Sequence, residues 1–418
     1  MGVVEQTVET VPAPPLRSGL YQSALVGLLS LNFGILFFDR NALNFLMPFV
    51  QPELHLTNTQ VGLTASALSF SWAVSAMVMG AAADRSGKRK MFLIGATIAF
   101  SVCSFLSGLA SSFFMLFGAR LLMGAVEGGV MPVSHTMIAI AVSPERRGLA
   151  MGVTQNFGSN LFGSFIAPVV LVWFATRLNW HNAFFIAGLP GIVSAVLLWF
   201  FIEEPKTSVP AAEKPDLLRH FSGILTSRNM ILCALISVLL VSYLVVCWAF
   251  MPLFLTQTRG FDPTTMSWLM GTLGISATIG SFVVAGISDR IGRKPVMIVT
   301  SFMGVILPLG AIYYSGSAWG LAALFFIGWA LTGIFPLFMA TVPSESVEHG
   351  RLATAIALVV GLGEVLGGVF SPTVAGWAAD LAGLTAPLWI MMGLCVGAGI
   401  LAFGLHETAP AVLKAKAG

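Results

Sequence analysis

Twelve apolar segments, each long enough to cross a lipid bilayer, follow one another along the chain. The bilayer core is about 30 Å thick, so a spanning helix needs about 20 predominantly apolar residues. Helices satisfy their own backbone hydrogen bonds in lipid, and no alternation of period two indicates strands. The sequence therefore predicts an all-α membrane protein with twelve transmembrane helices. The expected spans are residues 22–50, 59–82, 91–110, 112–138, 147–174, 182–202, 229–256, 264–288, 296–314, 318–342, 350–378 and 386–406.

The composition excludes soluble proteins of several classes. Hydrophobic residues make up 56% of the 418 residues and charged residues 9%, whereas an ordinary soluble protein has about 25% charged residues. So few charges cannot cover a soluble globule, which excludes a cytosolic enzyme, a nucleic-acid-binding protein and a disordered chain. The cysteines lie within apolar segments and lack the spacing of a disulfide framework or metal site, so we expect no metal and no other cofactor. They are Cys103, Cys233, Cys247 and Cys395.

Positive charge is concentrated on one side of the predicted topology. Only Arg177 and Arg259 fall on the opposite side, so the positive-inside rule places both termini in the cytoplasm. The lysines and arginines on the cytoplasmic side are Arg17, Arg85, Lys88, Arg89, Lys90, Arg146, Arg147, Lys206, Lys214, Arg219, Arg228, Arg290, Arg293, Lys294, Arg351, Lys414 and Lys416.

The longest polar loop divides the chain into two halves that resemble each other. At an offset of 204 residues, three prolines of the first half fall on prolines of the second: Pro48 on Pro252, Pro132 on Pro336, and Pro168 on Pro372. Six spans repeated in one orientation imply two bundles related by an axis along the membrane normal, an architecture that resembles the major facilitator superfamily. The expected units are a tail at 1–21, a bundle at 22–202, a linker at 203–228, a bundle at 229–406 and a tail at 407–418.

A charged motif between the second and third spans strengthens this resemblance. Residues 80–89 read GAAADRSGKR and are similar to the G-x-x-x-D-R-x-G-R/K-R motif of major facilitators, and residues 289–294 form a looser second copy. The resemblance implies a cytoplasmic latch, in which a carboxylate approaches a helix N-terminus and arginines bind carboxylates of the next loop, such as Glu145. The alternative is that these charges have no gating role and only determine the orientation of the spans in the membrane. The candidate gating residues are Asp84, Arg85, Arg89, Asp289 and Arg290.

Several charged residues lie well inside predicted spans, where each costs at least about 2.5–3.5 kcal/mol on insertion scales. Arg120 and Glu127 are two turns, or about 10.5 Å, apart on one helix face, so a substrate or a residue of the first span must lie between them. Asp39 and Arg40 supply both signs from the first span. A purely structural network that holds the first span against the fourth is the alternative. Glu364 is a further charge, within the eleventh span.

The segment FFDRNALN at 37–44, together with Arg120-x6-Glu127, resembles the anion:cation symporter family. This family includes bacterial hexonate and hexuronate transporters and animal sialin. The resemblance implies that Asp39 and Glu127 carry protons, while Arg40 and Arg120 handle charge coupling and the substrate carboxylate. It also implies that Trp72 stands near an aromatic lining position.

The eleventh span departs from the family pattern N-x-x-x-N-L-G-G. Gly361 and Val365 stand where the family has asparagines, and Glu364 is added. A less hydroxylated carboxylate, such as an aromatic acid, thereby becomes an alternative to a sugar acid. The repeat pairs Glu364 with Asn160 of the fifth span. The substrate-binding candidates are Arg40, Arg120, Trp72, Ser159, Asn160, Tyr243 and Glu364.

These features together predict a proton-coupled symporter that imports a small organic anion across the bacterial cytoplasmic membrane by alternating access. An uncoupled facilitator or antiporter of organic anions is the alternative within the same fold, and a membrane sensor is the alternative outside it. No H-E-x-x-H, G-x-S-x-G or nucleotide-binding loop occurs, so we expect no enzymatic activity. We expect a monomer whose partners are the organic anion, protons and lipid, without nucleic acid.

Overall fold

The computed structural model describes residues 18–204, 227–347 and 352–417, and the regular structure of these ranges is entirely helical. Within them, twelve helices are long and apolar enough to cross a membrane, which is the number that the sequence predicted. Most of the expected N-terminal tail and of the linker between the halves lies outside the described residues. The basic residues Lys206, Lys214, Arg219 and Arg351 lie outside them too.

The first half contains six spans, several of them built from more than one helical segment. The segments are α1 (Gly19–Arg40), α2 (Ala42–Glu53), α3 (Asn58–Ser86), α4 (Arg89–Gly108), α5 (Phe113–Glu127), α6 (Val130–Ala141), α7 (Pro144–Gly152), the π-helical η1 (Val153–Phe157) and η2 (Ser159–Ile166), α8 (Ala167–Arg177) and α9 (Trp180–Phe201).

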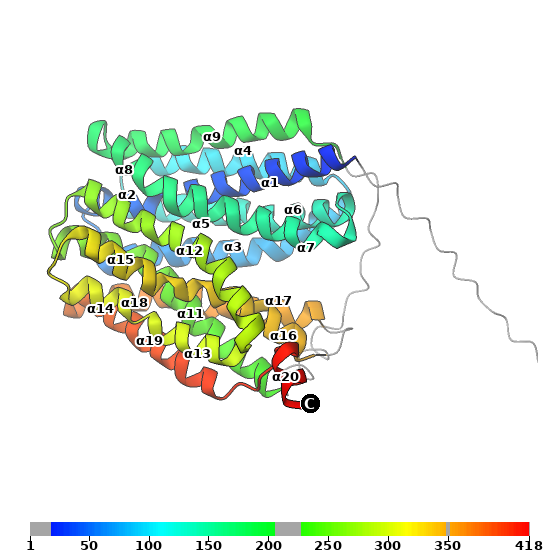
Figure 1. Cartoon of the computed structure of the whole chain (residues 1–418). Helices are drawn as coiled ribbons and strands as arrows, with labels where there is room; N and C mark the ends of the chain where they lie inside the picture. The colour runs from blue at the N-terminus through cyan, green and yellow to red at the C-terminus, as the bar shows by residue number, and fades with distance from the viewer. Residues whose placement is uncertain (1–17, 205–226, 348–351, 418) are drawn as a thin grey trace, which may run out of the picture.

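The second half repeats this arrangement. Its segments are α11 (Arg228–Leu253), η3 (Phe254–Thr258), α12 (Pro263–Ile291), α13 (Arg293–Met303), α14 (Ile306–Tyr313), α15 (Ala318–Trp329), η4 (Ala330–Ile334), η5 (Leu337–Thr341), α16 (Val342–Glu345), α17 (Leu352–Leu362), η7 (Gly363–Phe370), α18 (Ser371–Ala382), α19 (Thr385–Phe403) and α20 (Pro410–Ala417). The long helices of both halves lie side by side and run between the same two ends of the molecule (Figure 1).

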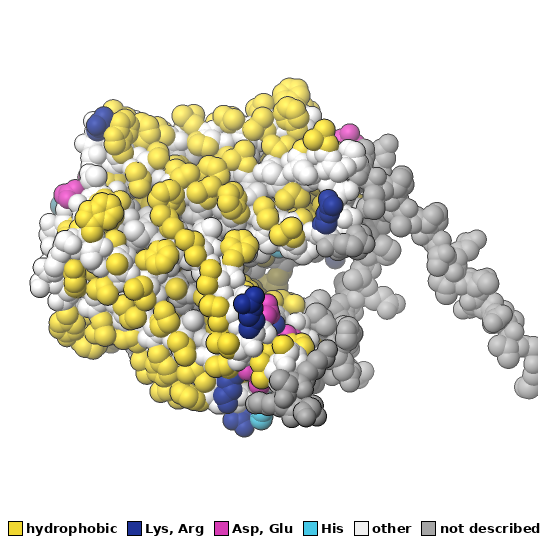
Figure 2. All heavy atoms as spheres, in the orientation of Figure 1, with side chains coloured by type: hydrophobic (Ala, Val, Ile, Leu, Met, Phe, Trp, Pro, Cys, Tyr) yellow, Lys and Arg dark blue, Asp and Glu magenta, His cyan; other side chains and the backbone are white. Residues whose placement is uncertain are grey.

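The surface has the polarity of a membrane-spanning bundle. Figure 2 shows hydrophobic side chains over most of the lateral surface, while charged side chains gather toward the two ends. Large apolar residues such as Met77, Phe114 and Trp319 are more than two-thirds exposed, which is favourable only where lipid covers them.

Several spans that the sequence predicted as continuous helices are interrupted, and three of these interruptions lie beside candidate site residues. The first span breaks at Asn41, whose side-chain amide donates to the Gly163 carbonyl at 3.0 Å. The fourth breaks at Gly128 and Gly129, directly after Glu127. The eleventh contains the π-helical η7, which carries Glu364. Such interruptions are frequent at functional sites because they re-aim side chains and release backbone groups.

One glycine on α5 and one directly after it allow this helix to pack closely on α3. A Cβ at Gly124 would collide with the Leu68 carbonyl, and a Cβ at Gly128 would collide with the Trp72 carbonyl. The glycines therefore act through packing, as small residues commonly do between membrane helices. This approach places the backbone of Trp72 beside the end of α5 that carries Glu127.

The two halves pack on each other at one end of the bundle and separate at the other. Inter-half packing joins α18 to α3, α12 to η2 and α8, and α11 to α2. Gly62 allows the first of these contacts, because a Cβ there would collide with the Pro372 carbonyl. At the opposite end, where α20 and the start of α1 lie, Figure 2 shows the surface hollowed between the halves. We call the packed end the far end and the hollowed end the terminal end.

Candidate functional site

A cavity of about 600 Å³ lies between the two halves, which is a size that suits a small molecule. Both halves supply its walls, and most of its polar side chains come from the first half. Aromatic side chains form much of the lining: Phe33, Phe37, Trp72, Trp248, Trp329 and Phe335. The site residues expected from the sequence that line it are Arg40, Trp72, Arg120, Ser159, Asn160 and Glu364.

Arg40 connects the cavity to a buried carboxylate. Its Nη1 lies 3.6 Å from Oε2 of Glu127, and its guanidinium carbon lies 5.3 Å from the centre of the Trp72 ring. A guanidinium over an indole face is attracted by the ring quadrupole. Arg40 therefore joins the first, second and fourth spans. The spacing of the charged residues had predicted a partner for the fourth span from the first, but not the contact with Trp72.

Arg120 is held in place through only one of its guanidinium nitrogens. Nη1 donates to the Arg40 carbonyl at 3.1 Å, close to the break in the first span, and lies 3.0 Å from the Met123 sulfur. Nε and Nη2 have no hydrogen-bond partner among the described residues, although the side chain lines the cavity and is only 2% exposed. These two nitrogens form the edge of a guanidinium that binds a carboxylate through two parallel hydrogen bonds.

Asp39 and Glu127 lie behind the cavity wall and do not line it. Both are fully buried, and within the part of the chain that the structure describes none of their carboxylate oxygens has a hydrogen-bond partner. The Ser104 hydroxyl lies beside Asp39 but donates to the Phe184 carbonyl at 2.9 Å. A buried ion pair is stable only when further hydrogen bonds satisfy its remaining lone pairs. The structural-network alternative requires charges that satisfy one another, and this cluster leaves most of its oxygens unpaired.

The polar residues of the fifth and eleventh spans face the same cavity from opposite halves. Ser159 donates to the Gln155 carbonyl at 2.6 Å within its own span, whereas Asn160 lies on η2 with its side chain at the cavity. Glu364 lies on η7, and Arg40 is close enough to interact with its carboxyl group electrostatically. The expected pair of Asn160 and Glu364 thus shares one cavity across the pseudo-symmetry axis.

Tyr243 does not belong to the cavity, contrary to the expectation from the sequence. It is fully buried within the second half, and its hydroxyl donates to the Gly304 carbonyl at 2.8 Å. The ring packs near Trp329, with the ring centroids 5.9 Å apart. Trp329 itself lines the cavity, but the sequence did not predict it as a site residue. Hydropathy cannot distinguish an aromatic residue that faces a cavity from one that packs against a helix.

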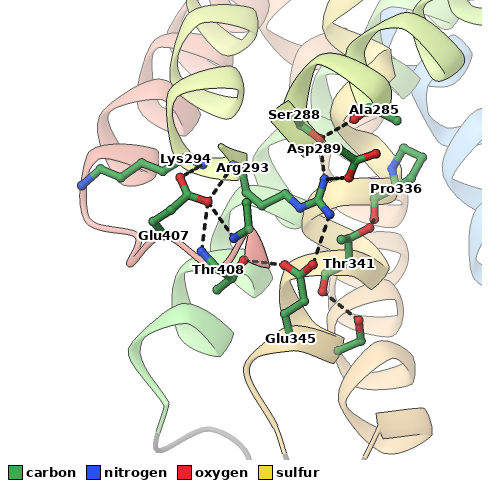
Figure 3. Close-up of polar contacts among 12 residues, drawn as sticks. Ala285, Ser288, Asp289, Arg293, Lys294, Pro336, Thr341, Glu345, Glu407 and Thr408 are labelled. Carbon is green, nitrogen blue, oxygen red and sulfur yellow. Dashed lines mark hydrogen bonds and ion pairs between the residues drawn. The ribbon is translucent and has the colours of Figure 1, made fainter. Parts of the chain in front are cut away.

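The second copy of the charged motif forms a network at the terminal end (Figure 3). Arg293 Nη1 lies 2.5 Å from Oδ1 of Asp289, and its Nη2 lies 3.1 Å from Oε1 of Glu345. Arg290, which the sequence suggested for this role, is exposed. In the first copy, Arg89 is buried and Arg85 is exposed. The side chains of Asp84 and of its suggested partner Glu145 lie outside the part of the chain that the structure describes.

Two glutamates cap helix N-termini at this end, in equivalent positions of the two halves. Glu407 accepts from the backbone N–H groups of Arg293 and Lys294 at 2.8 and 3.2 Å (Figure 3), and Glu204 accepts from that of Lys90. Burial opposes ionisation of Glu407, but backbone hydrogen bonds from α13 and from its own loop outweigh burial and lower its pKa. The sequence reading missed both caps, since each joins residues more than a hundred positions apart.

A carboxylate joins the two halves at the far end. Asp380, at the end of α18, accepts from the backbone N–H groups of Asn58 and Thr59 at 2.8 and 2.9 Å, and from the Thr59 hydroxyl at 2.5 Å. Asn58 and Thr59 open α3, so the negative charge sits at a helix N-terminus, where it is favoured. We call this contact the Asp380 latch. The sequence reading assigned Asp380 no role.

The described residues provide no evident metal site. No three His, Cys, Asp or Glu side chains among them gather as metal ligands, and all four cysteines are buried and unpaired. The residues that converge on the cavity instead are two arginines, a carboxylate, amides and aromatic rings, which suits an organic ligand with a charged group.

Comparison with known proteins agrees with this geometry. A family model described as Major Facilitator Superfamily matches residues 29–363 and, in a second match, 245–418. The hexuronate transporter of Bacillus subtilis is 26% identical over 85% of this chain and 88% of its own. The 3-(3-hydroxy-phenyl)propionate transporter of Escherichia coli is 29% identical over 77% and 78%. A bacterial homologue of the human lysosomal transporter Spinster, solved in an inward-facing and occupied conformation, has a TM-score of 0.77 at 17% identity, covering 93% of this chain and 97% of its own.

Proposed function

The chain belongs to the major facilitator superfamily, whose members are transporters and not enzymes, and we propose that it imports a small organic anion together with protons. The substrate binds in the cavity between the halves, which open to one side of the membrane at a time. Relatives across most of the chain's length transport organic acids of two chemical kinds, a hexuronate and a phenylpropionate.

The observation that carries the proposal is the free edge of Arg120. A guanidinium that lines a cavity with Nε and Nη2 unpaired is costly to bury, so it calls for a ligand that accepts two hydrogen bonds. A carboxylate fits this fork and also compensates its charge. The aromatic walls, which include Trp72, would cover the apolar part of an organic acid.

Proton coupling is proposed for Asp39 and Glu127. Intramembrane carboxylates mark proton pathways in transporters, and no described residue donates a hydrogen bond to these two. An arriving anion binds the free edge of Arg120 and competes with Glu127 for the guanidinium group of Arg40. With less positive charge available to them, the carboxylates would bind protons more readily, and a proton on Glu127 would in turn leave Arg40 free to attract the anion. Such coupling is reciprocal, so protons and anion favour each other's binding.

We base the orientation of the bundle in the membrane on the charge distribution of the sequence. With both termini in the cytoplasm, the terminal end is cytoplasmic, and this conformation faces inward. The Asp380 latch would then close the outer side. We propose that the charged motif residues Asp84, Arg85, Arg89, Asp289 and Arg290 control the cytoplasmic gate, where Arg293 provides the pairing in the second copy. We place the protein as a monomer in the bacterial cytoplasmic membrane.

Reconstitution into liposomes tests the proposal. Radiolabelled glucuronate and 3-(3-hydroxyphenyl)propionate serve as probes, and a pH gradient, acid outside, is imposed without any other gradient. A proton symporter concentrates a probe inside above its external level, and a protonophore abolishes this accumulation. A facilitator only equilibrates the probe, an antiporter moves it only against a preloaded anion, and a sensor moves neither probe.

A further inference from the structure

Glu364 brings a carboxyl group to the cavity whose charge, when it is ionised, is uncompensated. Arg40 and Arg120 balance Asp39 and Glu127 in number, so an ionised Glu364 is one negative charge in excess. No hydrogen bond or ion pair engages its carboxylate among the described residues. Arg40, the cation whose field reaches it, is already paired with Glu127 at 3.6 Å.

The local structure keeps the Glu364 carboxylate accessible from the cavity. The side chain is only partly buried and projects from the π-helical η7, in the wall opposite the arginines of the first half. Its Oε2 lies beside Gly368, four residues further on, where a Cβ would be in ordinary van der Waals contact with it at 3.6 Å. The carboxylate is therefore positioned to accept hydrogen bonds from a molecule in the cavity.

The two walls of the cavity therefore require ligand groups of opposite character. The first half offers the unpaired Nε and Nη2 of Arg120, which require an acceptor with negative charge. The second half offers a carboxylate, which repels a second anion and requires a donor or a cation. Aromatic rings such as Trp72 and Trp248 line the space between. A simple organic anion would satisfy the first wall and leave the charge of the second uncompensated.

We propose that the preferred substrates are amphoteric aromatic acids, which carry a carboxylate at one end and an amine or another strong hydrogen-bond donor at the other. The carboxylate binds Arg120, the ring lies between the aromatic walls, and the donor binds Glu364. This inference rests on the proposed function and narrows its substrate class. It makes Glu364 a specificity-determining residue.

Two matched probes test the inference by calorimetry on the purified full-length protein at pH 7. 4-(Aminomethyl)benzoate carries a cationic donor, and 4-methylbenzoate has the same ring and carboxylate without it. A hydrogen bond between two charged groups is worth about tenfold in affinity or more. We expect the wild type to bind the amine at least tenfold more tightly. Glu364→Gln should lose most of this preference while it still binds 4-methylbenzoate.

Gly361→Ala provides the matched control variant, because Gly361 lies on the same span and a Cβ there meets no atom within 4 Å. This variant should keep the wild-type preference. Equal affinity of the two probes for the wild type, or a preference that survives in Glu364→Gln, overturns the inference and leaves organic-acid transport intact. If the wild type binds neither these probes nor the two transport probes, the proposed function fails and this inference fails with it.

Discussion

Replacement of Asp380 by asparagine should shift the molecule away from the conformation described here. Asp380 is contributed by the second half, and its three hydrogen bonds all come from the start of α3 in the first half. These bonds exist only while the far end is closed. Asparagine keeps one acceptor oxygen but removes the negative charge, so the variant loses the charge–helix interaction and weakens the hydrogen bonds.

The size of the shift follows from the exposure of the latch. A charge at an exposed helix N-terminus contributes about 0.3–1 kcal/mol, and the exposed setting of Asp380 keeps its hydrogen bonds in the same low range. A total loss on the order of 1 kcal/mol changes a two-state ratio about fivefold. The ratio of far-end-closed to far-end-open molecules should therefore fall about fivefold.

Distance measurements between spin labels report this ratio directly. Leu109 and Leu381 lie on different halves and are 57% and 69% exposed, so cysteines at these positions accept labels, whereas the four native cysteines are buried. Asp262→Asn is the matched control. Asp262 accepts hydrogen bonds from the backbone N–H groups of Thr264 and Thr265, so it caps its own helix, α12, within the second half. An unchanged ratio in Asp380→Asn, or an equal shift in Asp262→Asn, would refute the reasoning.

Three further predictions concern other parts of the molecule. Arg120→Lys should weaken binding of 3-(3-hydroxyphenyl)propionate about tenfold or more, because an ammonium cannot reproduce the free guanidinium edge. Calorimetry measures this affinity, and an unchanged value would show that Arg120 has only a structural role. Gly124→Ala should destabilise the protein by about 1–3 kcal/mol through its collision with α3, whereas Gly118→Ala, which meets open space, should not; melting temperatures in detergent decide this. The lowered pKa of Glu407 means that its stabilising effect is present above the ordinary glutamate pKa and is lost as the pH falls through the lowered value. The difference in melting temperature between wild type and Glu407→Gln should accordingly shrink on acidification, and a constant difference would contradict the assignment.

Hydropathy and motif spacing predicted the number of spans and the convergence of the charged residues. The prediction worked for Arg40, Arg120 and Glu127 because charge inside lipid has few tolerable surroundings, so its position on a span already implies a buried partner or a cavity. The same reasoning could not place Tyr243, whose hydroxyl is satisfied by a backbone carbonyl within its own half. A single buried hydroxyl leaves no periodic signal in the sequence.

Contacts between residues far apart in the sequence could not be predicted either. The Asp380 latch joins residues more than 300 positions apart, and the interruptions of the first and eleventh spans depend on packing between helices. The second copy of the charged motif was located correctly, but the choice between Arg290 and Arg293 depends on which side chain the helix directs toward Glu345. Spacing within a short motif does not determine that direction.

The central claim is that protons bound at Glu127 and Asp39 drive accumulation of the anion. The most direct measurement compares two activities in the same proteoliposomes: exchange of labelled for unlabelled 3-(3-hydroxyphenyl)propionate, and its uptake driven by a pH gradient. Glu127→Gln mimics the protonated carboxylate without releasing a proton, so the account predicts that exchange persists near the wild-type rate while uphill accumulation is lost. Accumulation to the wild-type level in Glu127→Gln would contradict the account at its central residue.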